Sequence, residues 1–285
     1  MKILIFGVTG MIGHAMFRVL GRDSAHETIG TIRSESDLAF FDAGAARKLL
    51  VGVDVENCDA LMGSFVAIRP EIVINCVGAT KHKASGNDAL TAIPLNALLP
   101  HRLARLCAGF GSRLIHISTD CVYSGKQGNY TEDVPPDADD VYGRTKALGE
   151  LEYPNTITLR TSTIGHELRS HLGLLEWFLA QQDRCRGFRC AVFSGLPSVT
   201  LAQIVRDLVI PNQKLSGLFH VAGPSISKYE LLMNIAEIYK KSIEVVAEDA
   251  PVIDRSLNAD RFFDATGYRP PDWRTLIGAM HRDRQ

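Results

Sequence analysis

Tyr142 and Lys146 lie four residues apart, a spacing that suits proton transfer, and a hydroxyl precedes them in the chain at Thr119. On a helix, residues four apart share a face, so an ammonium there would stabilise a phenolate and lower the phenol's pKa from about 10. Such a phenol can protonate an alkoxide that forms when hydride reaches a carbonyl carbon, while the hydroxyl bonds the same oxygen. We therefore predict Thr119, Tyr142 and Lys146 to be the catalytic group of a nicotinamide-dependent enzyme. The alternative is that Tyr142 and Lys146 are ordinary residues of an amphipathic helix.

A glycine triplet near the start of the chain is typical of a dinucleotide site. Gly7 can turn the chain sharply, Gly10 lets the backbone approach a pyrophosphate, and Gly13 permits close helix packing. The phosphates would bind at the helix N-terminus, where free N–H groups and the dipole favour anions. A plain strand-to-helix turn is the alternative. The predicted cofactor contacts are Gly7, Thr9, Gly10, Met11, Ile12, Gly13, Arg33, Ser34, Cys76, Val77 and Gly78, together with Tyr142 and Lys146.

The end of the second expected strand indicates which dinucleotide binds. An NAD site usually has a carboxylate at this tip, but here Arg33 and Ser34 follow the strand. Both could receive a 2′-phosphate, so NADP(H) is preferred. Glu35 and Asp37 keep NAD(H) as an alternative, and Arg33 could also be a solvated surface charge.

Short apolar runs that alternate with helical patterns must position these residues. Runs of this kind predict a doubly wound parallel α/β sheet that is covered on both faces. The expected strands are residues 3–6, 28–32, 72–76, 114–117, 156–159 and 218–221.

Apolar stripes with stop signals predict the helices. In the first part of the chain the expected helices are residues 11–20, 59–68, 94–110 and 140–152. After Gly165 the rhythm changes, and we expect helices at 172–182, 200–210 and 226–239, with an irregular stretch through Pro197 between the first two. Two long polar loops, 78–91 and 124–139, leave carboxyl ends of strands and should frame a substrate.

Composition restricts the classes of function. The chain has 285 residues and a net charge of −1, so no global positive field exists to hold nucleic acid or an anionic membrane. No apolar run reaches the ~20 residues of a membrane span, and the apolar start is interpreted as a buried strand and not a signal peptide. Scattered cysteines without a paired motif indicate a reduced, cytoplasmic setting, and the histidines lack metal-ligand spacing, so no metal is expected.

Over its first 150 residues the chain resembles the extended short-chain dehydrogenase/reductase superfamily, which pairs a Gly-x-x-Gly-x-x-Gly turn with Ser/Thr and Tyr-x-x-x-Lys. Within it, residues 118–123 (STDCVY) and 142–150 (YGRTKALGE) look most like the dTDP-4-dehydrorhamnose reductase family. The resemblance implies NADPH-dependent reduction of the 4-keto group of a nucleotide-activated 4-keto-6-deoxyhexose in surface-polysaccharide precursor synthesis. The sugar could be dTDP-4-dehydrorhamnose or a UDP-2-acetamido-2,6-dideoxy-4-ketohexose.

The change of rhythm after Gly165 also predicts two parts of the chain. Residues 1–165 would form a dinucleotide-binding Rossmann domain to which 198–223 return. Residues 166–197 and 224–285 would form a smaller, mostly C-terminal α/β part that binds substrate. A homodimer is an assembly that the sequence leaves open.

Position 121 separates several related activities. Sugar-nucleotide 4,6-dehydratases of the superfamily carry a Glu there, and this chain has Cys121, which argues against dehydration. The GDP-fucose synthase family uses a Cys two residues after the catalytic Ser and a later His to epimerise its sugar. Cys121 and His171 match that arrangement, so a bifunctional epimerase-reductase is one alternative. A non-catalytic NADP-binding regulatory subunit is another.

Substrate contacts are expected around the same motifs. Arg255, in a segment that resembles one near the end of the rhamnose-pathway reductases, is the candidate for the diphosphate. Trp177 is expected in the core, with stacking against a base as the alternative. The remaining candidates for the nucleotide sugar are Lys81, His82, Asn96, Asp120 and Cys121.

Overall fold

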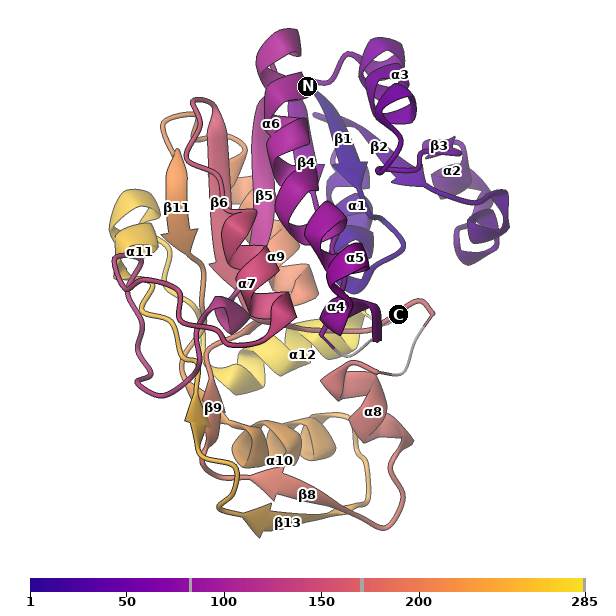
Figure 1. Ribbon diagram of the computed structural model, residues 1–285. Helices are drawn as coiled ribbons and strands as arrows, with labels where there is room; N and C mark the ends of the chain where they lie inside the picture. Colours follow the sequence, from indigo (N-terminus) through magenta and orange to yellow (C-terminus); the bar gives the residue numbers. More distant parts are fainter. Residues whose placement is uncertain (82–83, 170–171, 284–285) are drawn as a thin grey trace.

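A sheet of seven parallel strands forms the centre of the protein in a computed structural model that describes residues 1–81, 84–169 and 172–283 (Figure 1). The spatial order is β11-β6-β5-β4-β1-β2-β3. The central strands are buried on both faces, as continuous apolar runs predict. The strands are β1 (Lys2–Phe6), β2 (Glu27–Ile32), β3 (Leu49–Val51), β4 (Ile72–Asn75), β5 (Arg113–Thr119), β6 (Thr156–Thr161) and β11 (Gly217–His220). The six strands expected from the sequence are confirmed, and β3 was not expected.

Alternate residues of β1 enter two different apolar cores, one on each face of the sheet. Ile3 and Ile5 pack in a cluster that includes side chains of α1 (Met11–Gly21), α9 (Ser198–Ile204) and α12 (Trp273–Asp283). Leu4 and Phe6 pack on the other face with α3 (Cys58–Ile68) and α6 (Leu99–Phe110). Helices therefore cover both faces, and the predicted doubly wound fold is confirmed.

Helical turns occupy stretches that the sequence left as loops. Residues 78–91 were expected to form one polar loop, but α4 (Ala84–Asn87) and α5 (Ala89–Ala92) form within it. The Asp88 carboxylate accepts from the N–H of Leu90 and caps α5, which a polar composition alone does not indicate. The chain then runs through a π-helical segment, η2 (Ile93–Leu98), directly into α6. Between β2 and β3 lie η1 (Glu35–Phe40) and α2 (Ala43–Ala46).

Helix α7 (Val141–Leu148) begins where expected and ends four residues earlier than expected. Asp140 is its N-cap and accepts from the N–H of Gly143 at 2.7 Å. Gly149 ends the helix, and a Cβ added there would lie 1.9 Å from the Asn96 carbonyl oxygen. This close approach fixes the end of the helix against η2.

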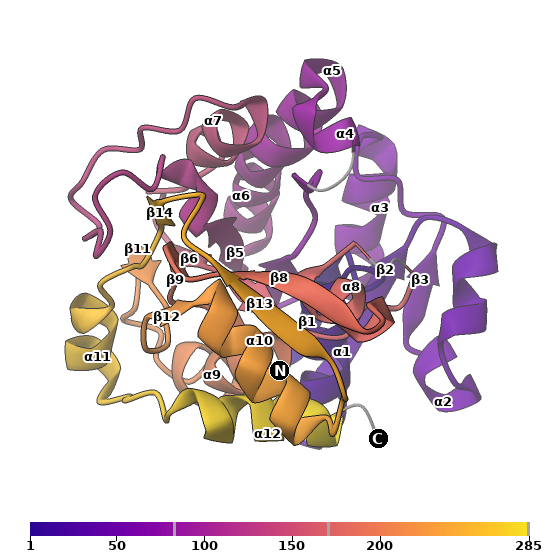
Figure 2. The same ribbon diagram turned by 90° about the horizontal axis from the view of Figure 1, so that it is seen from below.

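The later part of the chain forms small sheets below the main one (Figures 1 and 2). The stretch through Pro197, expected to be irregular, holds β8 (Arg184–Phe188), β9 (Ala191–Phe193) and β10 (Leu196–Pro197), so that expectation is wrong. These strands pair with distant ones, which no local pattern reveals: β8 with β13 (Glu244–Glu248), β10 with β7 (Thr163–Ile164), and β9 with both β12 (Ile226–Ser227) and β14 (Ile253–Asp254).

Three further helices and the returning strand complete the fold. Helix α8 (Leu174–Ala180) carries Trp177, which is 37% exposed, so the expected core position is wrong. The expected helix at 200–210 is formed by α9 and the π-helical η4 (Val205–Val209), and the one at 226–239 by α10 (Lys228–Ile238). Helix α11 (Asp260–Thr266) lies near β11. Strand β11 pairs with β6 in the main sheet, and the division into two functional parts stays a prediction.

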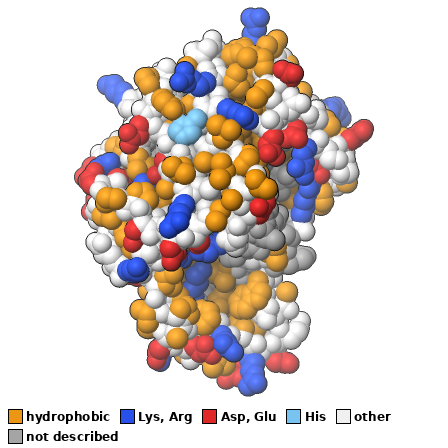
Figure 3. All heavy atoms as spheres, viewed as in Figure 1, with side chains coloured by type: hydrophobic (Ala, Val, Ile, Leu, Met, Phe, Trp, Pro, Cys, Tyr) orange, Lys and Arg blue, Asp and Glu red, His pale blue; other side chains and the backbone are white. Residues whose placement is uncertain are grey.

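Acidic and basic side chains are interspersed over the face seen in Figure 3, as the near balance of charge in the sequence leads one to expect. Among the described residues, no helix has the length and apolar character that a membrane crossing requires.

Candidate active site

The glycine turn after β1 takes a conformation that needs glycine. Gly7 has a φ of +88°, and it lies against the end of β4, where an added Cβ would be 3.0 Å from the Cys76 carbonyl carbon. An added Cβ on Gly13 would lie 2.1 Å from the Gly7 carbonyl oxygen, so α1 packs directly onto the turn. The turn and the helix therefore have a single close-packed arrangement.

The N-terminus of α1 fits the pyrophosphate of a dinucleotide. Gly10 is its N-cap, and none of the described side chains caps the first turn. A Cβ added at Gly10 would meet only the Gly7 carbonyl oxygen, at 3.5 Å, so the backbone here is open to a ligand. Thr9, Met11 and Ile12 are partly exposed beside it. Uncapped N–H groups, the helix dipole and an open backbone form an anion site.

The segment after β4 connects this turn to the predicted catalytic group. The N–H of Cys76 donates to the Phe6 carbonyl of β1 at 3.1 Å. Val77 follows, and a Cβ added at Gly78 would lie 4.0 Å from the Lys146 Nζ. The predicted cofactor contacts of residues 7–13 and 76–78 thus lie along one edge of the sheet, together with Lys146.

The tip of β2 carries exposed Arg33 and Ser34. Ser34 caps η1 by accepting from the Ser36 N–H at 3.3 Å. Asp37, one of the carboxylates that kept NAD(H) open, is buried and ion-paired with Arg169. Its carboxylate is therefore engaged by an arginine, whereas Arg33 is exposed to solvent.

Thr119 ends β5 and lies in contact with Tyr142 of α7. Its Oγ1 accepts from the N–H of Cys121 at 3.1 Å and donates to the Asp120 carboxylate at 3.1 Å. The Thr119 hydroxyl also lies near enough to the Tyr142 phenol to lower its pKa. The hydroxyl and phenol that sequence reasoning paired are thus neighbours.

Lys146 lies one turn after Tyr142 and is buried. Its Nζ donates to the Ile117 carbonyl of β5 at 2.8 Å. Burial lowers the pKa of Lys146 from 10.5 to about 8, against the opposing effects of Glu150 and Cys76. The ammonium is therefore held beside the strand that ends in Thr119.

The expected lowering of the phenol's pKa is not what the structure shows. Burial, followed by the neighbouring Cys121, raises the pKa of Tyr142 above its ordinary value, and the nearby Thr119 hydroxyl opposes this. Burial and the acidic neighbours both disfavour the phenolate, whereas the Thr119 hydroxyl favours it. Tyr142 is consequently a protonated phenol at neutral pH, ready to donate.

Asp120 and Cys121 lie in the short helical turn η3 (Asp120–Val122), directly after Thr119. Burial raises the pKa of the Asp120 carboxyl, while Arg255 and the hydrogen bond from Thr119 lower it. Burial and the Asp120 charge together raise the pKa of Cys121 to about 12. Burial therefore favours the thiol form of Cys121 over the thiolate.

The structure brings Arg255 to this cluster and gives it backbone partners. Its Nε donates to the Tyr123 carbonyl at 2.9 Å and its Nη2 to the Ser124 carbonyl at 3.3 Å. Arg255 thus fixes the start of the loop at residues 124–139. Its assignment to a diphosphate stays a prediction.

Two further predicted substrate contacts have protein partners. Lys81 is ion-paired with Asp140, the N-cap of α7. Asn96 is fully buried, accepts from the Ala79 N–H at 2.9 Å and donates to Thr145 at 3.2 Å. These contacts give Asn96 a positioning role between the loop and α7, and its contact with substrate stays a prediction. His82 and His171 lie outside the described residues.

Lys228 is a candidate that sequence reasoning missed. It begins α10, and its Nζ lies 4.8 Å from the centre of the Phe193 ring. Ser227 and Asp254 pair with the same residue, Val192 of β9, so Lys228 and Arg255 follow two strands that flank β9. Burial lowers the pKa of Lys228, opposed first by the charge of Asp120. A lone lysine at a helix start looks solvated in sequence, because its burial depends on strands from three distant segments.

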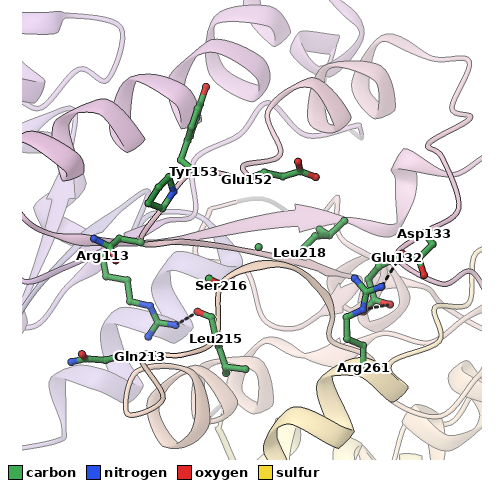
Figure 4. Close-up of a pocket in the computed structure, with 13 residues that line it drawn as sticks. Arg113, Glu132, Asp133, Glu152, Tyr153, Gln213, Leu215, Ser216, Leu218 and Arg261 are labelled. Atoms are coloured by element: carbon green, nitrogen blue, oxygen red, sulfur yellow. Dashed lines mark hydrogen bonds and ion pairs between the residues drawn. The ribbon is translucent and has the colours of Figure 1, made fainter.

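A cavity of about 600 Å³ lies away from this cluster, near the starts of β5, β6 and β11 (Figure 4). Arg113, Glu132 and Arg261 are among its lining residues. Arg113 donates to the carbonyls of Val209 and Leu215 at 2.7 Å, and Arg261 forms ion pairs with Glu132 and Asp133. Because these charges have partners, we place the candidate active site at the carboxyl ends of the strands and not in this cavity. No group of three or more metal-ligating side chains occurs within the described part of the chain.

Comparisons with known proteins show which family the chain resembles over its length. A family model described as RmlD substrate binding domain matches residues 1–283. The dTDP-4-dehydrorhamnose reductase of Aggregatibacter actinomycetemcomitans is 23% identical over 97% of each chain. Methionine adenosyltransferase 2 subunit beta of Danio rerio is 24% identical over 84% of this chain and 74% of its own. The solved structure of dTDP-4-dehydrorhamnose reductase from Bacillus anthracis in complex with NADP has a TM-score of 0.80 and 18% identity over 99% of both chains, which shows the shared fold.

Proposed function

Because the chain belongs to the RmlD substrate binding domain family, we propose that it reduces the 4-keto group of a nucleotide-activated 4-keto-6-deoxyhexose with a nicotinamide cofactor. The resemblance to the dTDP-4-dehydrorhamnose reductase family, predicted from the sequence, is confirmed by this match. The observation that carries the proposal is the closeness of the Thr119 and Tyr142 side chains, with Lys146 one helical turn after Tyr142, at the same sheet edge as the glycine turn.

The chemistry follows from the state of each side chain. A reduced nicotinamide supplies the hydride that the carbonyl carbon accepts. Tyr142, a phenol whose pKa is raised by burial, donates its proton to the developing alkoxide oxygen. The Thr119 hydroxyl, which donates to Asp120 in the free protein, would turn to donate to the same oxygen, and the Lys146 ammonium would stabilise the negative charge that forms nearby.

NADP(H) is the cofactor we propose, with NAD(H) as the weaker alternative. Arg33 is exposed at the tip of β2, where a guanidinium can bind a 2′-phosphate. Asp37 is paired with Arg169, which leaves its carboxylate less free to accept from a ribose hydroxyl. The NADP complex of the Bacillus anthracis relative supports this choice.

The nucleotide sugar is proposed to lie over η3, between α7 and the start of α10. Arg255 and Lys228 supply cationic charge for its diphosphate, and Asp120 and Cys121 lie beside the sugar. Both dTDP-4-dehydrorhamnose and a UDP-2-acetamido-2,6-dideoxy-4-ketohexose fit this chemistry. Precursor synthesis for a surface polysaccharide, in the cytoplasm, is the proposed setting, and all six cysteines are free, as a reducing compartment requires.

Oxidation of NADPH by the purified protein tests the proposal. The reaction is run with dTDP-linked and UDP-linked 4-keto-6-deoxy sugars in deuterated water, and the products are read by NMR. Turnover with one of them, without solvent deuterium at sugar carbons 3 or 5, identifies a simple reductase and its nucleotide. Deuterium at those carbons that is lost in Cys121→Ser would instead identify an epimerase-reductase.

A regulatory subunit is the second candidate, because methionine adenosyltransferase 2 subunit beta is among the relatives. Such a protein would bind NADPH, fail to oxidise it with every candidate ketone, and change the kinetics of a partner enzyme. The closeness of Thr119 and Tyr142, with Lys146 one turn later, favours the reductase. Tight binding of NADPH without turnover, for any sugar tested, would reverse that preference.

A further inference from the structure

Two side chains of one stretch of the chain attach helix α7 to the end of strand β5. Lys146 donates to the Ile117 carbonyl at 2.8 Å. Glu150, four residues later, accepts from the Ser118 hydroxyl at 2.8 Å. Lys146 and Glu150, four residues apart, therefore bond the consecutive strand residues Ile117 and Ser118, which come immediately before Thr119.

Glu150 is held in turn by an arginine from the neighbouring strand β6. Arg160 Nε and Nη2 donate to the two carboxylate oxygens of Glu150 at 2.7 and 2.6 Å. Ser118 and Arg160 are register partners in the sheet, so both reach Glu150 from the same side. The side chains of Arg160 and Glu150 are only 3% and 11% exposed. Because the ion pair is buried and bidentate, it holds the two side chains in a single relative orientation.

The same arginine reaches the loop at residues 124–139. Its Nη1 donates to the Tyr123 hydroxyl, and that hydroxyl donates to the Thr131 carbonyl at 3.0 Å. Tyr123 stacks on Tyr130 with ring centres 4.1 Å apart. One guanidinium thus connects the segment directly after α7, the end of β5 and a loop that we expect beside the substrate.

We propose that Glu150 and Arg160 are positioning residues of the active site: their ion pair fixes Thr119 relative to Tyr142 and Lys146. The inference rests on the proposed reductase function and adds two residues to it that touch neither cofactor nor substrate. The charge of Glu150 also favours the ammonium form of Lys146, so the carboxylate contributes to the electrostatics of the site as well as to its geometry.

The experiment uses Arg160→Ala, with Arg113→Ala as a matched control. Arg113 is also a partly buried arginine, but it begins β5, at the end far from Thr119, and donates to the carbonyls of Val209 and Leu215. A cavity of about 500 Å³ is lined by both Arg160 and Glu150, so a small cation can replace the missing guanidinium. We expect Arg160→Ala to lose roughly a hundredfold in kcat with little change in the KM for NADPH, since small displacements of catalytic groups have effects of this order.

Millimolar guanidinium chloride should restore much of the kcat of Arg160→Ala, whereas Arg113→Ala should retain wild-type kcat and not respond. Glu150→Gln keeps an acceptor for Ser118 and removes the charge, so the pH above which kcat falls should move down. A role in stability alone would not shift that pH. Wild-type kcat in Arg160→Ala, or an unchanged pH profile in Glu150→Gln, would overturn the inference.

Failure of the proposed function is a separate outcome, because it would appear as a wild-type protein without turnover. Hydrogen exchange read by mass spectrometry then tests the positioning role by itself. Arg160→Ala should speed exchange in peptides from α7 and from the end of β5, and Arg113→Ala should not. Equal exchange in these peptides for the two variants would refute the inference.

Discussion

Replacing Gly13 by alanine tests the cofactor site, because this glycine brings α1 against the turn after β1. The Cβ of Gly13→Ala would lie 2.1 Å from the Gly7 carbonyl oxygen and 2.7 Å from its carbon. The same helix offers a matched control in Gly21→Ala, whose Cβ would meet nothing within 4 Å. The two variants make the same chemical change in one helix with opposite steric results.

The size of the effect follows from the distances. Real Cβ atoms essentially never come closer than 3.0 Å, so helix and turn must move apart by about 0.9 Å, the difference between 3.0 and 2.1 Å. Overpacking of this kind costs about 1–3 kcal/mol of folding stability. Movement of the N-terminus also weakens its hydrogen bonds to phosphate, each worth about 1.5–3 kcal/mol, so NADPH should bind roughly ten- to hundredfold more weakly. Gly21→Ala should gain about 0.5–1 kcal/mol of stability and bind NADPH normally.

Urea denaturation gives the free energy of unfolding of each variant, and quenching of protein fluorescence gives the Kd for NADPH. The free energy of unfolding should fall in Gly13→Ala and rise in Gly21→Ala, and the Kd for NADPH should change in Gly13→Ala alone. Wild-type affinity in Gly13→Ala would refute the placement of the pyrophosphate at this helix.

Four further predictions concern the reaction and the pH dependence. Tyr142→Phe should lose at least about a hundredfold in kcat, because the proton donor is removed, and steady-state kinetics checks this. Burial lowers the pKa of Lys146 to about 8, so its ammonium is lost as the pH rises through that value. The kcat should therefore fall on the alkaline side of its pH profile. A flat profile would count against the role of Lys146. Arg33→Ala should raise the KM for NADPH by roughly tenfold and leave that for NADH unchanged, and equal effects on both would show that Arg33 does not read the 2′-phosphate. Burial lowers the pKa of His14 from 6.5 to about 4, so the unfolded chain takes up a proton before the folded chain does as the pH falls. The folded protein therefore loses stability between pH 6.5 and about 4. His14→Leu should show a flatter pH dependence of the free energy of unfolding in urea denaturation.

The order of elements and the core of the site could be predicted because they depend on local patterns. Continuous apolar runs predicted six strands of the main sheet, and the glycines at 7, 10 and 13 predicted the turn that joins β1 to α1. The spacing of Tyr142 and Lys146 sufficed to place both on α7. Parallel strands all end at one edge, so Thr119 and the glycine turn had to lie at the same side of the sheet.

What the sequence left open depends on contacts between distant segments. Strand β8 pairs with β13, some sixty residues later, so neither is visible from its own composition. The pKa of Tyr142 was misjudged because burial raises it, and burial is a property of the assembled fold. Arg160 gave a signal that could have been used: an arginine within a strand that is buried at all six positions requires a partner, and Glu150 is that partner.

The most direct test of the central claim follows the hydride itself. The protein is incubated with a dTDP-linked or UDP-linked 4-keto-6-deoxyhexose and NADPH that carries deuterium at the transferred position of the nicotinamide, and the product is examined by NMR. A reductase that works through Thr119, Tyr142 and Lys146 places this deuterium on carbon 4 of the sugar, and Tyr142→Phe abolishes the transfer. Unchanged ketone and unconsumed NADPH, in a protein that binds NADPH tightly, would contradict the account.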